Sequence, residues 1–357
     1  MGIDTVKPRK AQKVNNIPKP GISSIKASLR MRIKLYKKRA KEIEDYLSEH
    51  PDEWGKFQSE FNAEVNGIFR EIMIFEKENL SKGQKQKVEK LKSLFKKRLR
   101  NIFLHGVYFD WSFKKPYGYS GDFKIIDDIY NNNPPTTGFN RLFDNYLQMS
   151  AICVAVRNRK KDFKELISNF VSNHSEKVLK IMSLGCGPCR EVKELLTSNS
   201  FQGKDVLFHC YDHDINALDY AKKLLENSRK IKFIEENVLK LAAIKDPSAI
   251  IDEKYDLIYS TGLFDYLNYK VSVRLIKNLR SLLTKNGALL VSDVRDKYSN
   301  PSVHCMEWVG DWHLIYRDDD DFRQIFIDAG FQLSNLKISY EQQGIMQYVM
   351  AQCSKAT

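Results

Sequence analysis

The sequence contains no long apolar run, and this absence excludes several classes of protein. None of its 357 residues belongs to a stretch approaching the roughly 18–20 apolar residues that a membrane-spanning helix needs. The N-terminus also lacks the apolar core of a secretory signal. The chain starts Met-Gly, but Val6 stands where the myristoylation pattern requires Ser or Thr. We therefore expect a soluble, cytoplasmic protein without a transmembrane segment.

Cysteine is scarce as well. Six cysteines are too few and too dispersed for a disulfide framework in a chain of this length, which favours a reducing compartment. The sequence has no second C-x-x-C and no H-x-x-x-H to complete a zinc site, so we predict no metal centre. The cysteines are Cys153, Cys186, Cys189, Cys210, Cys305 and Cys353.

Acidic residues are few only in the first part of the chain. Residues 1–100 hold 25 Lys and Arg against 13 Asp and Glu, whereas the remainder holds 33 against 32. A basic face of this kind can bind nucleic acid, an anionic surface or an acidic partner, and it can equally be a solvated surface. These partners and the oligomeric state therefore stay open.

Apolar residues that recur at three and four positions predict a helical N-terminal part. Pro51 suits the first turn of a second helix and Ser81 the cap of a third, which indicates a small bundle. The aromatic- and glycine-rich stretch that follows is not periodic until Ser120, so we expect a loop there that runs into a helix. The predicted parts are a flexible basic arm (1–24), a basic helical bundle (25–107) and a lid loop with connecting helices (108–173).

From Lys177 onward short apolar strands alternate with helices. This alternation is typical of βαβ units and predicts an α/β fold with a doubly wound, mainly parallel sheet over residues 174–357. Two further apolar segments near the C-terminus predict an antiparallel hairpin at the sheet edge. The expected parallel strands end at Leu184, Asp212, Asn237, Thr261 and Val294.

The stretch Gly185–Cys189, G-C-G-P-C, supports two interpretations. Its C-x-x-C spacing suits a dithiol redox site, whereas its G-x-G between a strand and a helix suits a nucleotide-like ligand. Asp212 ends the next strand, where an acid would hold a ribose diol. Polar residues at two further strand ends complete one coherent site. We therefore favour a turn that binds a ligand, and we expect no redox role for Cys186 and Cys189.

Four segments resemble motifs I to IV of class I S-adenosylmethionine-dependent methyltransferases: IMSLGCGPCREV, CYDHDINAL, FIEENV and YDLIYSTGLFDYL. Two others, KPYGYSGDFKIIDDIY and MEWVGDWHLIYRDDDDF, are similar to a subgroup related to the bacterial enzyme that makes a 3-hydroxypalmitic acid methyl ester signal, an extracellular factor. The resemblance implies a Rossmann-like, seven-stranded methyltransferase sheet beside the N-terminal helical domain. It also implies S-adenosyl-L-methionine as cofactor and S-adenosyl-L-homocysteine as its product.

The resemblance further implies a cofactor site at the strand ends. Gly185 and Gly187 would let the turn pass under the methionine part, and Asp212 would take both ribose hydroxyls. Asp214 would instead cap the following helix. The other implied contacts are Asn237 and Val238 at the adenine, and Ser260, Gly262 and Leu263 on the cofactor's opposite side.

Two segments are candidates for the acceptor pocket. Tyr117 and Tyr119 belong to the lid loop, and Trp308, Trp312 and Tyr316 lie four residues apart, which predicts one helical face. Core packing would explain that spacing equally well. Arg317 could pair with a carboxylate, and the catalytic candidates are Tyr119 and Glu307, with His304 and His313 as further bases.

The predicted function is methyl transfer to a small molecule, with a carboxylate or fatty-acid-like compound as candidate acceptor. A carboxylate is already nucleophilic, whereas an alcohol or amine would benefit from a base. The alternative is an RNA or protein methyltransferase that grips its substrate with the basic N-terminal helices. A third hypothesis is a non-enzymatic scaffold.

Overall fold

The computed structural model describes residues 22–198, 200–201, 203–226 and 228–353. The first 21 residues of the predicted basic arm lie outside this range, and its last three form the start of α1. No helix in the described ranges is long and apolar enough to cross a membrane. The helices are α1 (Ile22–Glu49), α2 (Gln58–Leu80), α3 (Lys85–Arg98), α4 (Gly106–Lys114), α5 (Phe123–Asn131), α6 (Gly138–Gln148), α7 (Ala151–Asn173), α8 (Arg190–Thr197), α9 (Ile215–Leu224), α10 (Val238–Ala243), α11 (Tyr269–Ser281), α12 (Val303–Trp308) and α13 (Asp319–Asp328).

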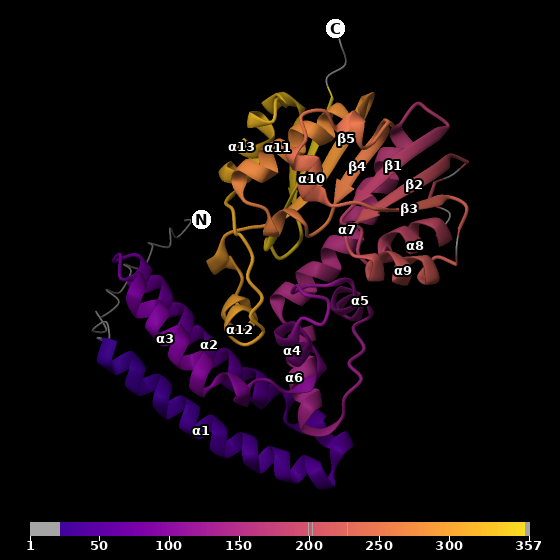
Figure 1. The fold of residues 1–357 in the computed structure, drawn as a ribbon. Helices are drawn as coiled ribbons and strands as arrows, with labels where there is room; N and C mark the ends of the chain where they lie inside the picture. Colours follow the sequence, from indigo (N-terminus) through magenta and orange to yellow (C-terminus); the bar gives the residue numbers. More distant parts are fainter. Residues whose placement is uncertain (1–21, 199, 202, 227, 354–357) are drawn as a thin grey trace, which may run out of the picture.

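Seven strands form one sheet in the order β3-β2-β1-β4-β5-β7-β6 (Figure 1). β1 to β5 are parallel, and β7 is antiparallel to both β5 and β6. The predicted fold class is confirmed, including the C-terminal hairpin. The strands are β1 (Val178–Leu184), β2 (Asp205–Asp212), β3 (Ile231–Glu235), β4 (Tyr255–Ser260), β5 (Leu283–Val294), β6 (Leu336–Tyr340) and β7 (Met346–Gln352).

Helices cover both faces of the sheet, and the alternation along each strand decides which face a residue contacts. Ile181 of β1 belongs to the buried cluster that contains α7, α8 and α9 residues. The next residue, Met182, belongs to the cluster that contains α10, α11 and α13 residues. Successive strand residues point to opposite faces, so a strand covered on both sides is continuously apolar. This explains why every position of the central strand β4 is buried, whereas the edge strands β3 and β6 contain the exposed Lys232 and Lys337.

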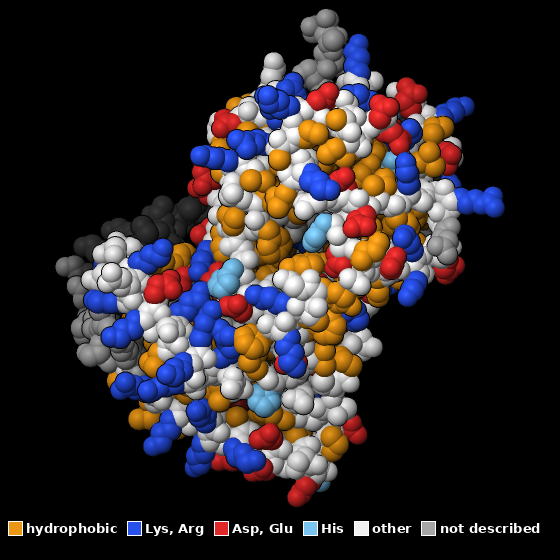
Figure 2. Space-filling model, viewed as in Figure 1, with side chains coloured by type: hydrophobic (Ala, Val, Ile, Leu, Met, Phe, Trp, Pro, Cys, Tyr) orange, Lys and Arg blue, Asp and Glu red, His pale blue; other side chains and the backbone are white. Residues whose placement is uncertain are grey.

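The N-terminal helices form a layer below the sheet in Figure 1. The predicted apolar stripe of α1 is buried, including Leu29, Ile43 and Leu47. These residues share one continuous hydrophobic cluster with α7 and with Ile181 of the sheet. Lys and Arg side chains gather over the lower left of Figure 2, where α1 to α3 lie. The layer is therefore basic outside and joined to the rest of the protein inside.

Ser81 ends α2 instead of capping the third helix, since α3 begins at Lys85 with Gln84 as its N-cap. Two further predicted elements differ from the structure. The expected loop from residue 108 is helical as far as Lys114, because Tyr108 and Phe109 are buried and pack α4 into the core. The sequence of residues 269–287 predicts a helix that ends at Asn286-Gly287, but α11 ends at Ser281 and this pair lies within β5, which begins at Leu283 and shifts its register against β4. Both patterns are local, and in both cases tertiary packing decides the outcome.

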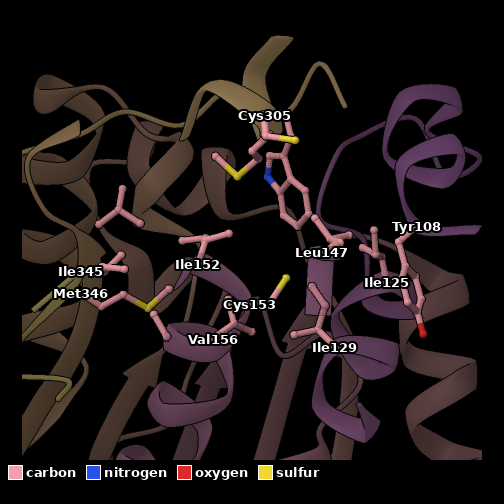
Figure 3. Packing of buried hydrophobic residues seen from close by; sticks show 14 of the residues in the cluster. Tyr108, Ile125, Ile129, Leu147, Ile152, Cys153, Val156, Cys305, Ile345 and Met346 are labelled. Atoms are coloured by element: carbon pink, nitrogen blue, oxygen red, sulfur yellow. The ribbon is translucent and has the colours of Figure 1, made fainter. Parts of the chain in front are cut away.

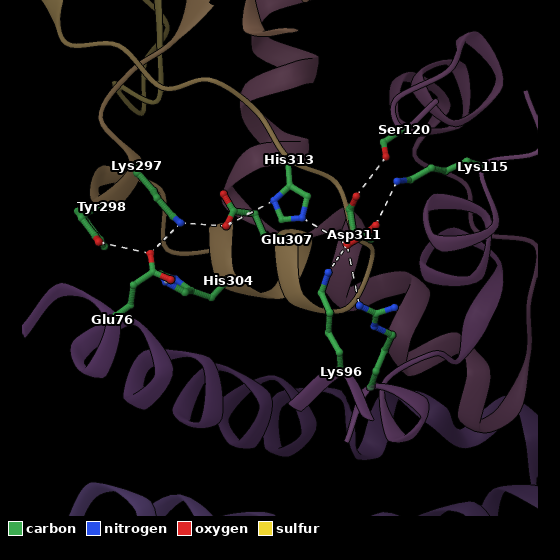
Figure 4. A network of polar contacts seen from close by, with 11 residues as sticks. Glu76, Lys96, Lys115, Ser120, Lys297, Tyr298, His304, Glu307, Asp311 and His313 are labelled. Carbon is green, nitrogen blue, oxygen red and sulfur yellow. Dashed lines mark hydrogen bonds and ion pairs between the residues drawn. The ribbon is translucent and has the colours of Figure 1, made fainter. Parts of the chain in front are cut away.

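Asp311 joins three N-terminal cations to the segment that follows β5 (Figure 4). Its Oδ1 lies 2.5 Å from Lys96 Nζ and 3.9 Å from Arg100 Nη2. Its Oδ2 lies 3.2 Å from Lys115 Nζ. These contacts lower the pKa of Asp311 even though burial opposes ionisation. Part of the N-terminal positive charge is thus neutralised internally, next to Trp312.

Glu76 of α2 anchors a second polar cluster in the same view (Figure 4). Its Oε1 lies 2.7 Å from Lys297 Nζ, and its Oε2 lies 3.3 Å from His304 Nε2. Lys297 Nζ also donates to Glu307 Oε2 at 2.9 Å. Burial alone would raise the pKa of Glu76, but the His304 and Lys297 contacts outweigh it and lower this pKa to about 2. Glu76 is therefore a buried, ionised carboxylate that links the N-terminal helical layer to the segment after β5.

Candidate active site

The turn between β1 and α8 is built from left-handed backbone conformations. Gly185 and Gly187 have φ of 64° and 52°, where any side chain would be strained. A Cβ at Gly187 would meet no atom within 4 Å, so this part of the turn borders open space. The backbone N–H of Cys186 donates to the carbonyl of Tyr211 at 3.0 Å. The turn is thus fixed to β2 while its glycines leave room for a ligand.

Asp212 at the end of β2 braces this turn. Its Oδ2 accepts the Gly187 N–H at 2.9 Å, and its Oδ1 accepts the Asp214 N–H at 3.0 Å. A carboxylate offers about four lone-pair positions, so it can accept further hydrogen bonds from a ligand. Asp214 caps α9 by accepting the Asn216 N–H at 2.9 Å, which confirms the predicted cap.

The loop between α4 and α5 folds over the same edge of the sheet. Tyr119 Oη donates to Asp214 Oδ2 at 3.1 Å. Gly121 lies so close to Trp312 and Tyr266 that a Cβ there would be 2.7 Å from Tyr266 Oη. The Tyr119 hydrogen bond therefore holds the loop near the end of β2. At the opposite wall the loop can approach Trp312 and Tyr266 closely because Gly121 has no side chain.

Gly118 and Gly121 form a matched pair for testing that close approach. Their φ values are 87° and 72°, so alanine is strained at either position, by roughly 1 kcal/mol or more. A Cβ at Gly118 would meet nothing within 4 Å, unlike one at Gly121. We expect Gly121→Ala to lower the free energy of unfolding by about 2 kcal/mol more than Gly118→Ala, as in other overpacked sites. Urea unfolding measures both, and equal losses would contradict the close approach.

A cavity of about 330 Å³ lies between this loop, the glycine turn and α7. Asp212 and His213 contribute to its polar edge. Its other part is lined by apolar side chains from several elements, some of which appear in Figure 3. We name this part the apolar chamber and define it by Ile126, Ile129, Leu147, Ile152, Val156, Leu314 and Met346.

The predicted cofactor residues divide into two groups. Gly185, Gly187, Asp212, Gly262 and Leu263 all line the cavity. Three others are not among its lining residues. Ser260 Oγ donates to the carbonyl of Leu184 at 2.8 Å, whereas Asn237 is exposed and caps α10, which begins at Val238. The two residues predicted at the adenine thus lie outside the enclosed part of the site.

Arg317 does not line the cavity, and this corrects its prediction as a carboxylate anchor. Its Nη1 donates to the Asp293 carboxylate at 2.9 and 3.0 Å and to the carbonyl of Phe264 at 3.1 Å. Its Nη2 donates to the carbonyl of Leu267. The guanidinium is buried, with these donors engaged inside the protein. Arg317 therefore supports the ends of β4 and β5.

Trp308, Trp312 and Tyr316 do not share a helical face, because α12 ends at Trp308. Trp308 is fully buried and packs edge-on against Phe95 of α3, with ring centroids 5.4 Å apart. Tyr316 also lies outside the cavity lining. Trp312 lines the cavity and donates from Nε1 to Tyr266 Oη at 2.7 Å. Of the three aromatics, the structure brings only Trp312 to the cavity.

Neither catalytic candidate is placed to act as a base. Glu307 is buried outside the cavity lining, where it is paired with Lys297. Tyr119 lines the cavity, but burial and the nearby Asp212 and Asp214 raise the pKa of its phenol. Tyr119 therefore keeps its proton at neutral pH and can donate a hydrogen bond.

The remaining predicted residues also lie outside the cavity lining. The ring of Tyr117 packs on Phe123, with centroids 4.7 Å apart. His304 lies beside Glu76, and His313 Nε2 is 3.3 Å from Asp311 Oδ1. These two histidines belong to the polar clusters that join the layers.

The residues of the cavity wall that sequence reasoning missed include a buried arginine and two buried acids, Arg159, Glu191 and Asp265. Each is only 4% exposed. Burial raises the pKa of Glu191 to about 7, so this carboxyl is partly protonated at neutral pH. The sequence did hold a signal for Arg159, because it interrupts the apolar stripe that Ile152 and Val156 begin on α7.

Comparisons with known proteins agree with this geometry. Residues 182–289, which include the glycine turn and Asp212, match a family described as "Methyltransferase domain". A search of curated proteins finds no match. A "possible exported protein" from Bordetella parapertussis has TM-score 0.52 and 18% identity over 83% of this chain and 96% of that chain, which shows a shared fold.

Two solved methyltransferases align less well. Magnesium protoporphyrin IX methyltransferase from Synechocystis has TM-score 0.43 and 14% identity over 58% of this chain and 89% of that chain. Human N-acetylserotonin methyltransferase has TM-score 0.38 and 15% identity over 54% of each chain.

The residues of the matched region fit a nucleoside cofactor. The open space at Gly187 leaves room for the cofactor's methionine part, and the Asp212 carboxylate can accept hydroxyl hydrogen bonds. The sheet order, with β7 inserted antiparallel between β5 and β6, is that of the predicted methyltransferase sheet. Residues 182–289 of the chain are therefore part of a methyltransferase domain that can hold S-adenosyl-L-methionine.

Proposed function

We propose that this enzyme methylates a small molecule, and that the acceptor is a carboxylic acid or another fatty-acid-like compound. The observation that supports this most is that the cofactor turn and the apolar chamber are walls of one cavity. An enclosed, mainly apolar cavity with a few polar groups suits a small molecule. A macromolecular substrate would instead need an open groove at the methyl donor.

The cofactor supplies a methyl group activated by a sulfonium, and the protein must align donor and acceptor and exclude water. Gly185 and Gly187 would lie along the methionine part, and Asp212 would accept the ribose hydroxyls. The Tyr119 loop would cover the site as a lid. A carboxylate acceptor requires no base, which is consistent with the absence of Glu307 from the cavity lining.

The other predicted cofactor contacts are part of this proposal. Asn237 and Val238 would meet the adenine at the open end, where the exposed α10 cap lies beside β3. Gly262 and Leu263 would line the side opposite the glycine turn. Ser260 would act indirectly, because its hydroxyl is bonded to Leu184 of β1. The assignment to the 3-hydroxypalmitic acid methyl ester subgroup is also proposed here, and it rests on residues 115–130 and 306–322.

The alternative, an RNA or protein substrate, is favoured by the basic face of α3. Its exposed cations include Lys85, Lys87, Lys90 and Lys97. The affinity of these cations for a nucleic acid would fall steeply as the salt concentration increases, because each phosphate contact releases counterions. Salt-dependent RNA binding together with methyl transfer to RNA would favour this alternative over a small molecule.

Isothermal titration calorimetry with S-adenosyl-L-methionine tests the cofactor site. We expect the wild type to bind and Asp212→Ala to weaken binding roughly ten- to a hundredfold, because a charged acceptor of two hydroxyl hydrogen bonds is lost. Asp219→Ala, an exposed change on α9, is the control and should leave the affinity unchanged. A wild type that fails to bind the cofactor would rule out the proposed function.

The acceptor class is tested with a labelled methyl donor and an extract of small molecules. We expect label in an apolar, base-labile methyl ester, which mild alkali releases as methanol. Label that resists alkali, or that stays with protein or RNA, would contradict the proposed acceptor.

A further inference from the structure

Arg159 is a buried cation in the wall of the cavity. It belongs to α7 and follows the chamber residues Ile152 and Val156 along the same helix. Only 4% of its surface is exposed. Its guanidinium lies against Gly262, where a Cβ would be 2.9 Å from both Nη1 and Nη2. The glycine at the end of β4 therefore makes room for a charge at this point.

The guanidinium of Arg159 lies beside the Tyr130 phenol, but no carboxylate of the described residues is within hydrogen-bond distance of it. Its Nε has no hydrogen-bond partner among the described residues, and its ion-pair partner Asp265 lies 3.8 Å away from Nη1. Arg317, in the same region, has an Asp293 carboxylate and two backbone carbonyls within hydrogen-bond distance. Burying a charge without such partners is costly. The comparison indicates that Arg159 is partnered by something that enters the cavity.

The nearby carboxyls do not fully balance the two arginines. Asp265 and Asp293 are both buried and lie close enough to interact. Burial, together with the nearby Asp265, raises the pKa of Asp293 well above its ordinary range. Two adjacent carboxyls in one dry site cannot both ionise easily. Asp265 thus interacts with Asp293 as well as with the more distant Arg159, which leaves the Arg159 guanidinium open to an anion.

We propose that Arg159 binds a carboxylate of a ligand at the junction between the glycine turn and the apolar chamber. This inference rests on the proposed function and assigns one binding residue within its site. A guanidinium offers paired donors that match a carboxylate. Two ligands of this enzyme could supply that group: the methionine end of the cofactor, or a carboxylic acid acceptor whose apolar part fills the chamber.

Calorimetry with two probe pairs tests the proposal and separates the two sources. The first pair is S-adenosyl-L-homocysteine and 5′-methylthioadenosine, which lacks the amino-acid end. The second is octanoate and 1-octanol, added to protein saturated with S-adenosyl-L-homocysteine. Arg159→Gln should weaken the carboxylate member of one pair roughly ten- to a hundredfold and leave its partner unchanged. The affected pair identifies the source.

Two further variants separate binding from folding. Arg159→Lys keeps the charge and should recover part of the lost affinity. Arg157→Gln is the matched control, because Arg157 lies on the same helix but donates to Gln148 outside the cavity. Arg157→Gln should bind both members of each probe pair with the same relative affinity as the wild type. Circular dichroism checks that each variant is folded.

Several results would overturn the proposal. One is an Arg159→Gln variant that binds all four probes as the wild type does, and another is a variant that loses affinity for both members of a pair alike. A wild type that binds each carboxylate no better than its partner would also refute it, and this needs no variant. A wild type that binds neither nucleoside would instead refute the proposed function, and the carboxylate site with it.

Discussion

Replacing Arg317 by methionine is expected to lower the free energy of unfolding by about 3–5 kcal/mol, the usual cost of removing one partner from a buried ion pair. The change leaves Asp293 buried without its cation and removes the donors to the carbonyls of Phe264 and Leu267. Methionine has a similar length and keeps the apolar contacts of the side-chain stem. Chemical denaturation of the two proteins measures the difference.

This variant also distinguishes structural support from substrate binding. Arg323→Met is the control, because Arg323 is partly exposed and pairs with the exposed Asp320, so its loss should cost at most about 0.5 kcal/mol. We expect the folded fraction of Arg317→Met to retain its affinity for S-adenosyl-L-homocysteine. A stable Arg317→Met protein that loses turnover of a carboxylate acceptor would restore Arg317 as an anchor.

Replacing Glu76 by glutamine is expected to cost about 3–4 kcal/mol at pH 7. The pKa of Glu76 falls from its ordinary value of 4.5 to about 2 in the folded protein, and each unit of such a shift is worth roughly 1.4 kcal/mol. Because the folded pKa is the lower one, the ionised carboxylate stabilises the protein fully above about pH 4.5. This stabilisation is lost as the pH falls from about 4.5 through about 2.

The stability difference between wild type and Glu76→Gln should therefore shrink below pH 4.5 and nearly vanish near pH 2. Urea unfolding at pH 7, 5, 4 and 3 follows this change. Glu89→Gln, an exposed change on α3, should show no such dependence. A difference that stays constant over the whole range would mean that the Glu76 charge does not tie α2 to Lys297 and His304.

The strand ends could be predicted because their signal is local. Gly185, Gly187 and Asp212 follow apolar strands directly, and parallel strands place their carboxyl ends at one edge. The acceptor side of the site was harder to predict, because it depends on contacts between segments that are more than a hundred residues apart. Trp312 and Arg317 illustrate this. They are five residues apart, yet one lines the cavity and the other is bonded inside the protein.

The helical spacing of the aromatic residues after β5 led to a wrong prediction. Residues 308, 312 and 316 fit a helix in sequence, but α12 stops at Trp308 and the chain turns at Asp311, whose φ is 53°. That turn brings Asp311 to Lys96 and Lys115, contacts with distant helices that no local pattern reveals. The division of the chain into four parts stays a prediction, although one hydrophobic cluster already joins α1 to the sheet.

The position of β7 has a consequence for the order in which the enzyme becomes competent during synthesis. β7 follows the other six described strands of the sheet in sequence, and it inserts between β5 and β6. Its first residue, Met346, lines the cavity that also contains Tyr119. A chain still being synthesised therefore holds an open gap in this wall after the glycine turn and Asp212 have formed. β7 thus completes the wall of the cavity late in synthesis, and a chain that stops before Met346 cannot shield the methyl donor from water.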